Sequence, residues 1–558
     1  MNSQICKSWD KVVSVFLMQL ALCSHALADG HQDAMNGQAA YDHDEYGKAI
    51  PFFTRAIQSG ELLPGDLLVA YFQRGASYNR TGQYDQAIAD ADAAIRLKPD
   101  YEAAHYERGY AYLGKRQYDD AIVEFGRAIR INPRSEFSYF QRAQAYAKKG
   151  LHDQAIADFD QAIRLKPDFV VAYIDRGGVY ADMGQYDRAI ADDSAAIKLQ
   201  SDNVFILYNR ALAYVDAGRY APAIADLDAA IHLKPDFAAA YRLRGRAYSE
   251  NGLPEPGFND YDTALRLNPN DADAYANLGD WYMDKGQYDH AIADFDAAIR
   301  LKPDYEVAYL NRGNCYVHKG QSDRALGDYE TAIRLKPDDA MPYSNLGMVY
   351  YNRAQYDRAI IEFDTAIRLN FGRANVYLYR GLAHAALDHP AKAVADYDAA
   401  INANRDQPDA YFVRGVTRYA LRRFAEAGAD FEQSMRVKPS DIYPILWLHL
   451  AHAKMGKANP DEFARNADKM DRAQWPGPVL EFYLGKSTLE QARLAAAQGD
   501  AKQQHNQSCE LAFYAGEYEL MRSNTAAAKL LLQQAVDTCK PDFAERMGAL
   551  AELRWAKE

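Results

Sequence analysis

The sequence lacks the short motifs that place catalytic groups in the common enzyme classes. It has no nucleophile elbow, no phosphate-binding loop, no His-Glu-x-x-His and no Cys-x-x-Cys. His449 and His452 lie three residues apart on an expected helix, which is enough for two metal ligands, but no third ligand is evident. We therefore expect a protein that is not an enzyme and holds neither a cofactor nor a metal.

Basic residues are outnumbered, with 64 Lys and Arg against 77 Asp and Glu and a formal net charge of −13 at pH 7. Nucleic-acid-binding surfaces are positively charged because they face phosphates, so we expect no nucleic-acid partner. Long apolar runs are also missing after the N-terminal region. We expect no transmembrane segment once a signal peptide is removed.

Residues 1–28 have the pattern of a secretory signal peptide. The apolar run at 12–23 is too short to span a bilayer with ease, and Ala26-Leu27-Ala28 matches an A-x-A cleavage site. Cleavage is predicted after Ala28. The alternative is a lipoprotein signal with lipidation at Cys23, but that pattern has a small residue before the cysteine, where this chain has leucine. We expect soluble export to the periplasm or beyond.

Cysteine is scarce, and two of the five, Cys6 and Cys23, fall in the signal. Cys509 and Cys539 are placed near the start of the first helix and the end of the second helix of an expected hairpin. Antiparallel packing brings those ends together, so we predict a disulfide, which an oxidising compartment favours. The alternative is two buried thiols. Cys315 is then left as a small buried residue on the core side of a helix.

What the sequence has in abundance is repetition with a period of 34 residues. No insertion or deletion interrupts the step between residues 68 and 441. One small residue marks each unit: Gly75, Gly109, Ala143, Gly177, Ala211, Gly245, Gly279, Gly313, Gly347, Gly381 and Gly415. A fixed period in this range predicts a solenoid of stacked supersecondary units around a continuous core.

Each unit reads as two helices, as residues 304–338 illustrate. Asp304 is placed to cap the first helix, and Gly320 ends it at a position where a left-handed backbone suits glycine. Asp323 is placed to cap the second helix. Two helices of about 12–14 residues joined by a short turn form an antiparallel hairpin.

Small residues predict where the two helices approach closely. Gly313 on the first helix is expected to face Ala325 and Ala332 on the second, and most units keep alanine at the latter two places. The unit at 238–271 departs from this pattern because Pro254 and Pro256 lie near the start of its second helix. We expect that helix to begin late or to be locally loose.

Arginine precedes the marker residue in most units, and an acidic residue follows the arginine sixteen places later in every unit. The arginines are Arg74, Arg108, Arg142, Arg176, Arg210, Arg244, Arg312, Arg380 and Arg414. Leu278 and Leu346 interrupt the series. We predict a structural ladder of half-buried ion pairs between the two helices of each unit.

These units resemble the tetratricopeptide repeat family. The pattern is carried, in one unit, by Tyr173, Gly177, Tyr180, Gly184, Tyr186, Ala189 and Ala196. The resemblance implies an all-α, right-handed superhelical solenoid of antiparallel helix hairpins. After the predicted signal peptide at 1–28, we expect a degenerate first unit at 29–67, eleven 34-residue units at 68–441 and a degenerate helical C-terminal module at 442–558.

The C-terminal module carries a second resemblance, to the C-terminal half of the NlpI family. The matching segments are Glu481-Phe482-Tyr483-Leu484-Gly485, Phe513-Tyr514-Ala515-Gly516-Glu517-Tyr518 and Ala549-Leu550-Ala551-Glu552-Leu553. That family comprises periplasmic tetratricopeptide lipoproteins of Gram-negative bacteria that present cell-wall hydrolases to a processing protease. The resemblance implies a periplasmic protease or a cell-wall hydrolase as partner. This chain departs from the family by its many more repeats and its poor lipidation signal.

Two rows of residues are candidates for partner binding, because the first helices line the concave face in tetratricopeptide proteins. Amides that could pair with a peptide backbone are Gln141, Asn209, Asn277, Asn311 and Asn345. Aromatic anchors are Tyr106, Phe137, Phe140, Phe205 and Tyr208. The alternatives are that asparagine is simply common in this repeat and that the aromatic stripe is packing between repeats.

The sequence thus favours a periplasmic scaffold or adaptor that binds proteins or extended peptides. The alternative is an accessory factor in envelope assembly or in polysaccharide or protein export.

Overall fold

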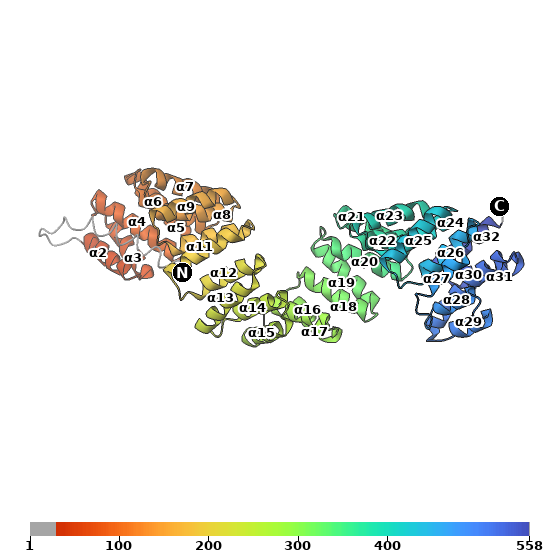
Figure 1. The fold of residues 1–558 in the computed structure, drawn as a ribbon. Coiled ribbons are helices and arrows are strands. Elements are labelled where there is room, and N and C mark those ends of the chain that lie inside the picture. Colours follow the sequence, from red (N-terminus) through yellow and green to blue (C-terminus); the bar gives the residue numbers. More distant parts are fainter. Residues whose placement is uncertain (1–28, 557–558) are drawn as a thin grey trace. The chain divides into compact units, whose positions relative to one another are not determined.

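The computed structural model describes residues 29–556, so the predicted signal peptide, its cleavage after Ala28 and Cys23 lie outside the described residues. Within that range the chain forms 31 α-helices and no strand, which confirms the all-α prediction (Figure 1). The described residues divide into two compact units, 29–269 and 270–556. The boundary between the units falls between two repeats of the array. The unbroken 34-residue period does not predict this division.

The first helix of each repeat begins close to the position that the period predicts. These helices are α4 (Pro64–Arg80), α6 (Glu102–Gly114), α8 (Glu136–Lys148), α10 (Val170–Asp182), α12 (Val204–Asp216), α14 (Ala238–Glu250), α16 (Ala272–Asp284), α18 (Glu306–His318), α20 (Ala340–Asn352), α22 (Ala374–Ala386) and α24 (Pro408–Ala420).

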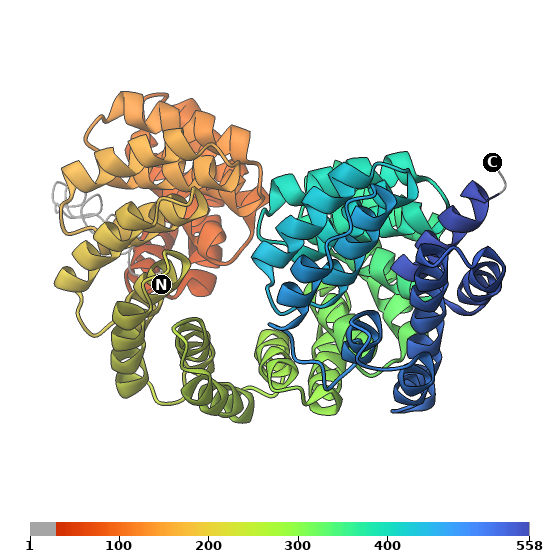
Figure 2. The ribbon, with the colours of Figure 1, turned by 45° about the vertical axis from the view of Figure 1, so that its right-hand side comes forward.

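The second helices follow after short turns. They are α5 (Tyr84–Leu97), α7 (Tyr118–Ile131), α9 (His152–Leu165), α11 (Tyr186–Leu199), α13 (Tyr220–Leu233), α15 (Pro254–Leu267), α17 (Tyr288–Leu301), α19 (Ser322–Leu335), α21 (Tyr356–Arg368), α23 (Pro390–Ala403) and α25 (Phe424–Val437). Within each unit the pairs follow one another in a stack (Figure 2).

The close approach within a pair depends on a glycine and an aromatic ring. A Cβ atom on Gly313 would lie only 2.7 Å from the ring of Tyr329 on α19. The predicted partners Ala325 and Ala332 are fully buried, but the atoms nearest the glycine belong to Tyr329. Glycine is therefore needed here because the tyrosine ring takes the space that a side chain would occupy.

The turn chemistry is partly as predicted. Gly320 has φ 71°, the left-handed conformation expected of the residue that ends a helix. The capping predictions are wrong, because Tyr305 and Gln321 occupy the N-cap positions of α18 and α19 without a side-chain cap. Asp323 instead lies in the first turn of α19 and pairs with Arg353 of the next repeat at 2.7 Å.

The prediction of a delayed helix in the 238–271 unit is also wrong. Helix α15 begins at Pro254, in register with the other second helices, because both prolines fall in the first turn, where a missing N–H costs nothing. The residue that makes this pair unusual is Gly257, on which a Cβ would lie 2.8 Å from the carbonyl oxygen of Gly245.

The ion-pair ladder is present in all nine units that carry the arginine. In eight of them Nε and Nη2 of the arginine donate to both carboxyl oxygens of the acid sixteen residues later. The exception is Arg108, from which only Nη2 donates to Glu124. In six units Nη1 also reaches an aspartate of the preceding repeat. The ladder therefore ties neighbouring repeats together as well as the two helices of a pair.

The degenerate first unit forms a helix pair of its own, α2 (Asp29–Asp42) and α3 (Tyr46–Ser59). Ala49, Phe53 and Ala56 are buried, and the ring of Phe53 packs against Gly37 as the repeat aromatics do elsewhere. The pair completes the N-terminal end of the array core.

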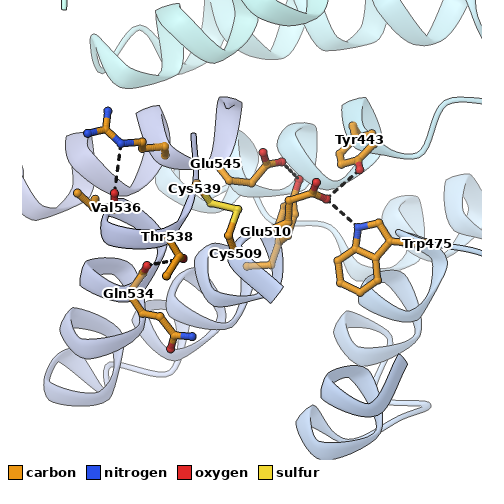
Figure 3. Close-up of a disulfide and its surroundings, with 11 residues drawn as sticks. Tyr443, Trp475, Cys509, Glu510, Gln534, Val536, Thr538, Cys539 and Glu545 are labelled. Carbon is orange, nitrogen blue, oxygen red and sulfur yellow. Dashed lines mark hydrogen bonds between the residues drawn. A yellow bond between two sulfur atoms is a disulfide. The ribbon is translucent and has the colours of Figure 1, made fainter. Parts of the chain in front are cut away.

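The C-terminal module is helical without the 34-residue register. Its helices are α26 (Tyr443–Lys454), α27 (Pro460–Ala467), α28 (Gly477–Tyr483), α29 (Leu489–Ala496), α30 (Ala501–Met521), α31 (Thr525–Thr538) and α32 (Ala544–Trp555). Cys509 and Cys539 form the predicted disulfide (Figure 3). Cys509 lies in the middle of α30 rather than near its start, because α30 is 21 residues long and begins eight residues before it. Cys315 is a buried free cysteine.

Candidate partner-binding surface

The first helices form the inner side of the array within each unit. Consecutive first helices contact one another, from α4 through α14 in one unit and from α16 through α24 in the other, whereas consecutive second helices approach each other less closely. Helices on the inside of a curved stack are the ones that crowd together. Side chains that remain exposed on the first helices therefore line the inner face.

The predicted amide row is only partly available to a partner. Asn311 Nδ2 donates to Asp280 Oδ1 at 2.7 Å, and Asn345 Nδ2 donates to Asn314 Oδ1 at 2.9 Å. Each bond joins one first helix to the preceding one, so these amides already hold the inner face together. Burial raises the pKa of Asp280 to about 6, although the bond from Asn311 opposes that shift.

The other amides differ in exposure. Gln141 is 4% exposed and cannot reach a ligand in this conformation. Asn209 and Asn277 are half-buried, and within residues 29–556 neither side chain makes a hydrogen bond to the chain. These two are the members of the row whose amides are open to a partner.

Three of the five aromatic candidates must be corrected, because they are core residues. Tyr106, Phe137 and Phe140 are 3%, 2% and 0% exposed. The ring of Phe169, from the turn before the next repeat, lies 5.5 Å from that of Phe137 and 4.9 Å from that of Phe140. Phe137 and Phe140 are thus buried between repeats, and Tyr106 packs on Phe125 of its own repeat, because burying such large apolar surfaces is favourable.

Phe205 is the exception, with 52% of its surface exposed on α12. Tyr208 is partly buried, and both rings contact Phe237, at 5.7 and 5.3 Å between centroids. Phe205 is therefore the one aromatic of the predicted row with a large apolar surface open to a partner.

In the unit 270–556, the C-terminal segment packs against the array's first helices. Asp542 accepts a hydrogen bond from the Tyr351 hydroxyl at the end of α20, at 2.9 Å. Helix α32 contacts α24, and the ring of Trp555 lies 5.8 Å from that of Tyr419. Arg554 pairs with Asp388, in the turn after α22, at 2.7 Å. A cavity of roughly 120 Å³ remains between α32 and these helices.

The position of α32 depends on buried carboxyl groups that sequence reasoning missed. Lys454 Nζ lies 3.1 Å from Glu517 and 2.6 Å from Glu552, and the Tyr419 hydroxyl is within hydrogen-bond distance of both acids. These four residues are here called the Lys454 cluster. Burial is the main cause that raises the pKa of Glu517 to about 8, and the negative charge of the neighbouring Glu552 adds to it.

A second group of acids lies two helical turns away on the same faces. Glu510 of α30 accepts from the Tyr443 hydroxyl at 2.8 Å and from Trp475 Nε1 at 2.7 Å, beside the disulfide (Figure 3). Glu545 of α32 accepts from Tyr514 at 2.9 Å, and burial with the nearby Glu510 raises its pKa to about 8.

The sequence does hold one signal for these acids. Glu510 and Glu517 are seven residues apart on α30, and Glu545 and Glu552 are seven apart on α32, so each pair lies on one face of its helix. All four are at most 8% exposed. They hold helices of the C-terminal module together.

Neither histidine singled out in the sequence belongs to a metal centre in the part of the chain that the structure describes. His449 packs on Phe463, with 4.4 Å between ring centroids, and His452 lies 3.8 Å from Glu462. No group of three or more His, Cys, Asp or Glu side chains suited to a metal ion occurs between residues 29 and 556. The helices found there also include none that is long and apolar enough to cross a bilayer.

Comparison with solved structures finds other tetratricopeptide proteins. A chain of the APC/C hetero-tetramer Cut9–Hcn1 is 14% identical, with 80% of this chain and 99% of that chain covered and a TM-score of 0.41. A tetratricopeptide repeat protein from Parabacteroides merdae is 21% identical over 45% of this chain and 98% of its own, with a TM-score of 0.38. YrrB, described as a TPR protein with an unusual peptide-binding site, is 23% identical over 33% of this chain and 95% of its own, with a TM-score of 0.27.

Family models match along most of the array. Models described as tetratricopeptide repeat match residues 72–136, 137–169, 260–293, 342–372 and 378–441, and a model described as TPR repeat matches 211–252, 279–320 and 313–353. The resemblance of the C-terminal module to the NlpI family stays a prediction. The repeats provide a scaffold suited to protein–protein interaction, since proteins with such repeats bind protein or peptide partners. The chain belongs to the tetratricopeptide repeat family.

Proposed function

We propose that the protein is a non-catalytic scaffold or adaptor of the periplasm, which holds protein or extended-peptide partners against its first helices. The observation that carries this proposal is the packing of α32 within the unit 270–556. The inner face there already accommodates a helix of the same chain, through Met547 against Thr417 and Trp555 against Tyr419. A surface that can hold one amphipathic segment has the shape and chemistry to hold another.

The inner face of each unit, taken by itself, has exposed side chains that can bind a partner. Phe205 is 52% exposed, and on the other unit Val307 and Met341 are 43% and 37% exposed on α18 and α20. Half-buried Asn209 and Asn277 add amides that can both donate to and accept from a peptide backbone. On α12 the exposed ring of Phe205 and the open amide of Asn209 are four residues apart, so one face of that helix offers both an apolar anchor and an amide to a peptide.

Site-specific photo-crosslinking in living cells would test the surface directly. Benzoylphenylalanine at Phe205, on the inner face, is compared with the same group at Val123 on α7, which is 49% exposed. A second pair is Met341 on α20 and Ile361 on α21, the latter 60% exposed. We expect discrete adducts from Phe205 and Met341 and none from the two second-helix controls. Equal labelling at all four positions would contradict the proposal.

Location and partner class need separate measurements. Mass spectrometry of the mature N-terminus is expected to find Asp29, whereas a lipidated Cys23 would show an anchored protein. A processing protease or a cell-wall hydrolase among the crosslinked partners would support the adaptor role that the NlpI resemblance implies. Export or polysaccharide machinery would instead favour the envelope-assembly alternative.

A further inference from the structure

One position of the second helices is apolar in every repeat of the array except one. Its occupants are Ala91, Phe125, Phe159, Leu227, Tyr261, Phe295, Tyr329, Phe363, Tyr397 and Phe431. In α11 the same position is Asp193, which is only 3% exposed. A carboxyl group therefore sits where the other repeats bury an apolar side chain.

The carboxyl lies in the place of the missing ring. In the regular repeats the aromatic ring packs against the glycine of the first helix, as Phe125 does at 2.9 Å from a Cβ built on Gly109. A Cβ on Gly177 would instead meet Asp193 Oδ1 at 3.5 Å. Within residues 29–556 that oxygen has no hydrogen-bond partner. A buried, unpaired carboxylate is costly, whereas the protonated form is tolerated far better.

The charged groups around Asp193 are already committed to other partners. On α10, Arg176 donates to both oxygens of Asp192 at 2.8 and 2.6 Å. On α12, Arg210 donates to both oxygens of Asp226 of α13 at 2.7 and 2.6 Å, and its third arm reaches Ser194. Burial raises the pKa of Asp193 to about 7, Asp192 and Asp226 add to the shift, and Arg210 opposes it.

The apolar core is thin at the same place. A large buried cluster spans α6 to α10, from Tyr106 to Val179, and another spans α12 to α14, from Ala211 to Ala247. Between them the buried cluster is limited to Ala189, Ile190 and Ala213. A segment with little buried apolar contact is where local opening requires the least free energy.

We propose that the α10–α11 repeat is a pH-sensitive joint within residues 29–269, closed when the Asp193 carboxyl is protonated and loosened when it ionises. Because the folded state holds this proton more tightly than the unfolded chain, local stability is greatest at low pH. Local stability falls as the pH rises from about 4 to about 7. In this range an increase of one pH unit can raise the equilibrium constant for local opening up to about tenfold. At neutral pH the loosened joint lets the repeats before α10 move independently of the repeats after α11 within this unit.

Hydrogen exchange of the full mature chain between pH 5 and 8, corrected for intrinsic rates, tests the joint. In the wild type, protection of α11 peptides is expected to fall with pH while that of α9 peptides stays level. Asp193→Asn should remove the slope, and Asp193→Phe should remove it and add protection by restoring the ring. Asp182→Asn changes an exposed acid of the same repeat and should leave the slope intact.

Two results would overturn the proposal. One is an α11 slope no steeper than that of α9 in the wild type, and the other is a slope that persists in Asp193→Asn. If Asp193→Phe fails to fold, the Asn variant still decides, since it keeps the shape of the side chain and removes only its charge.

Discussion

Arg312 donates two parallel hydrogen bonds to Asp328, which lies sixteen residues later. Nε donates to Oδ2 at 2.9 Å and Nη2 donates to Oδ1 at 2.6 Å. The acid's side chain is 9% exposed and the arginine's is 17% exposed. A bidentate pair of this kind fixes the angle between α18 and α19, and the remaining arm of Arg312 reaches Asp296 of the preceding repeat. The same geometry recurs along the array and gives neighbouring repeats a common register.

Arg312→Leu is expected to destabilise the α18–α19 repeat by about 3 kcal/mol, because it leaves Asp328 buried without its partner. The double change with Asp328→Leu should recover most of the loss. Thermal melting combined with hydrogen exchange of α18 and α19 measures both. Arg334→Leu, at an exposed position of α19, is the matched control, and an equal melting shift for the two single variants would refute the ladder.

Leu346→Arg should complete the ladder where it is interrupted. Glu362 lies sixteen residues after Leu346, and burial with the nearby Glu330 raises its pKa. A new guanidinium would pair with both acids and stabilise this repeat by about 1–2 kcal/mol. The raised pKa of Glu362 means that the wild-type repeat loses stability as the pH rises above the ordinary pKa of a glutamate. The melting temperature of the variant should therefore depend less on pH. A lower melting temperature at pH 8 would show that the leucine packing matters more.

Reducing the disulfide should loosen the C-terminal module selectively. The bridge closes a loop of 30 residues, worth about 3–4 kcal/mol in the chain-entropy model. Cys509→Ser with Cys539→Ser should lower the melting of α30–α32 and leave the repeats unchanged, as followed by hydrogen exchange. Thiol titration of denatured, unreduced protein starting at Asp29 should find one thiol, that of Cys315. Three free thiols would disprove the bridge.

The Lys454 cluster predicts a module whose stability falls as the pH rises from the acidic to the neutral range. The pKa of Glu517, about 8, lies above its ordinary value, so the folded state holds a proton that the unfolded chain releases. Stability is therefore full below about pH 4.5 and falls as the pH rises to about 8. Glu517→Gln should flatten this dependence between pH 5 and 9 without altering that of the array. Tryptophan fluorescence reports it, because Trp555 lies over Lys454.

The local features of the repeat could be predicted because they join residues close in sequence. Gly313 and Tyr329, or Arg312 and Asp328, are separated by one helical hairpin whose length never varies over 68–441. The disulfide was predictable for a similar reason, since Cys509 and Cys539 belong to one hairpin. The cap predictions failed because each helix begins one or two residues away from the expected start, so that Asp304 precedes the N-cap residue Tyr305 and Asp323 follows the N-cap residue Gln321.

The candidate surface was harder to predict. Phe137 and Phe205 occupy equivalent repeat positions, yet one is 2% and the other 52% exposed. Periodicity gives both rings the same partner from the next repeat, Phe169 or Phe237, so the repeat pattern does not distinguish their exposure. Likewise Asn311 and Asn277 occupy the same repeat position, but of the two only Asn311 donates to an aspartate on the first helix of the preceding repeat.

By itself the sequence determined the helices, their pairing and the ladder, since a strict period repeats the same short-range contacts in each unit. Only the tertiary structure decided which aromatics remain exposed, that Lys454 lies between Glu517 and Glu552, and that α32 packs on α24. The contacts of Lys454 and of α32 join residues about 60 to 140 positions apart. No local pattern encodes them, because they arise from how complete helices pack once the array has formed.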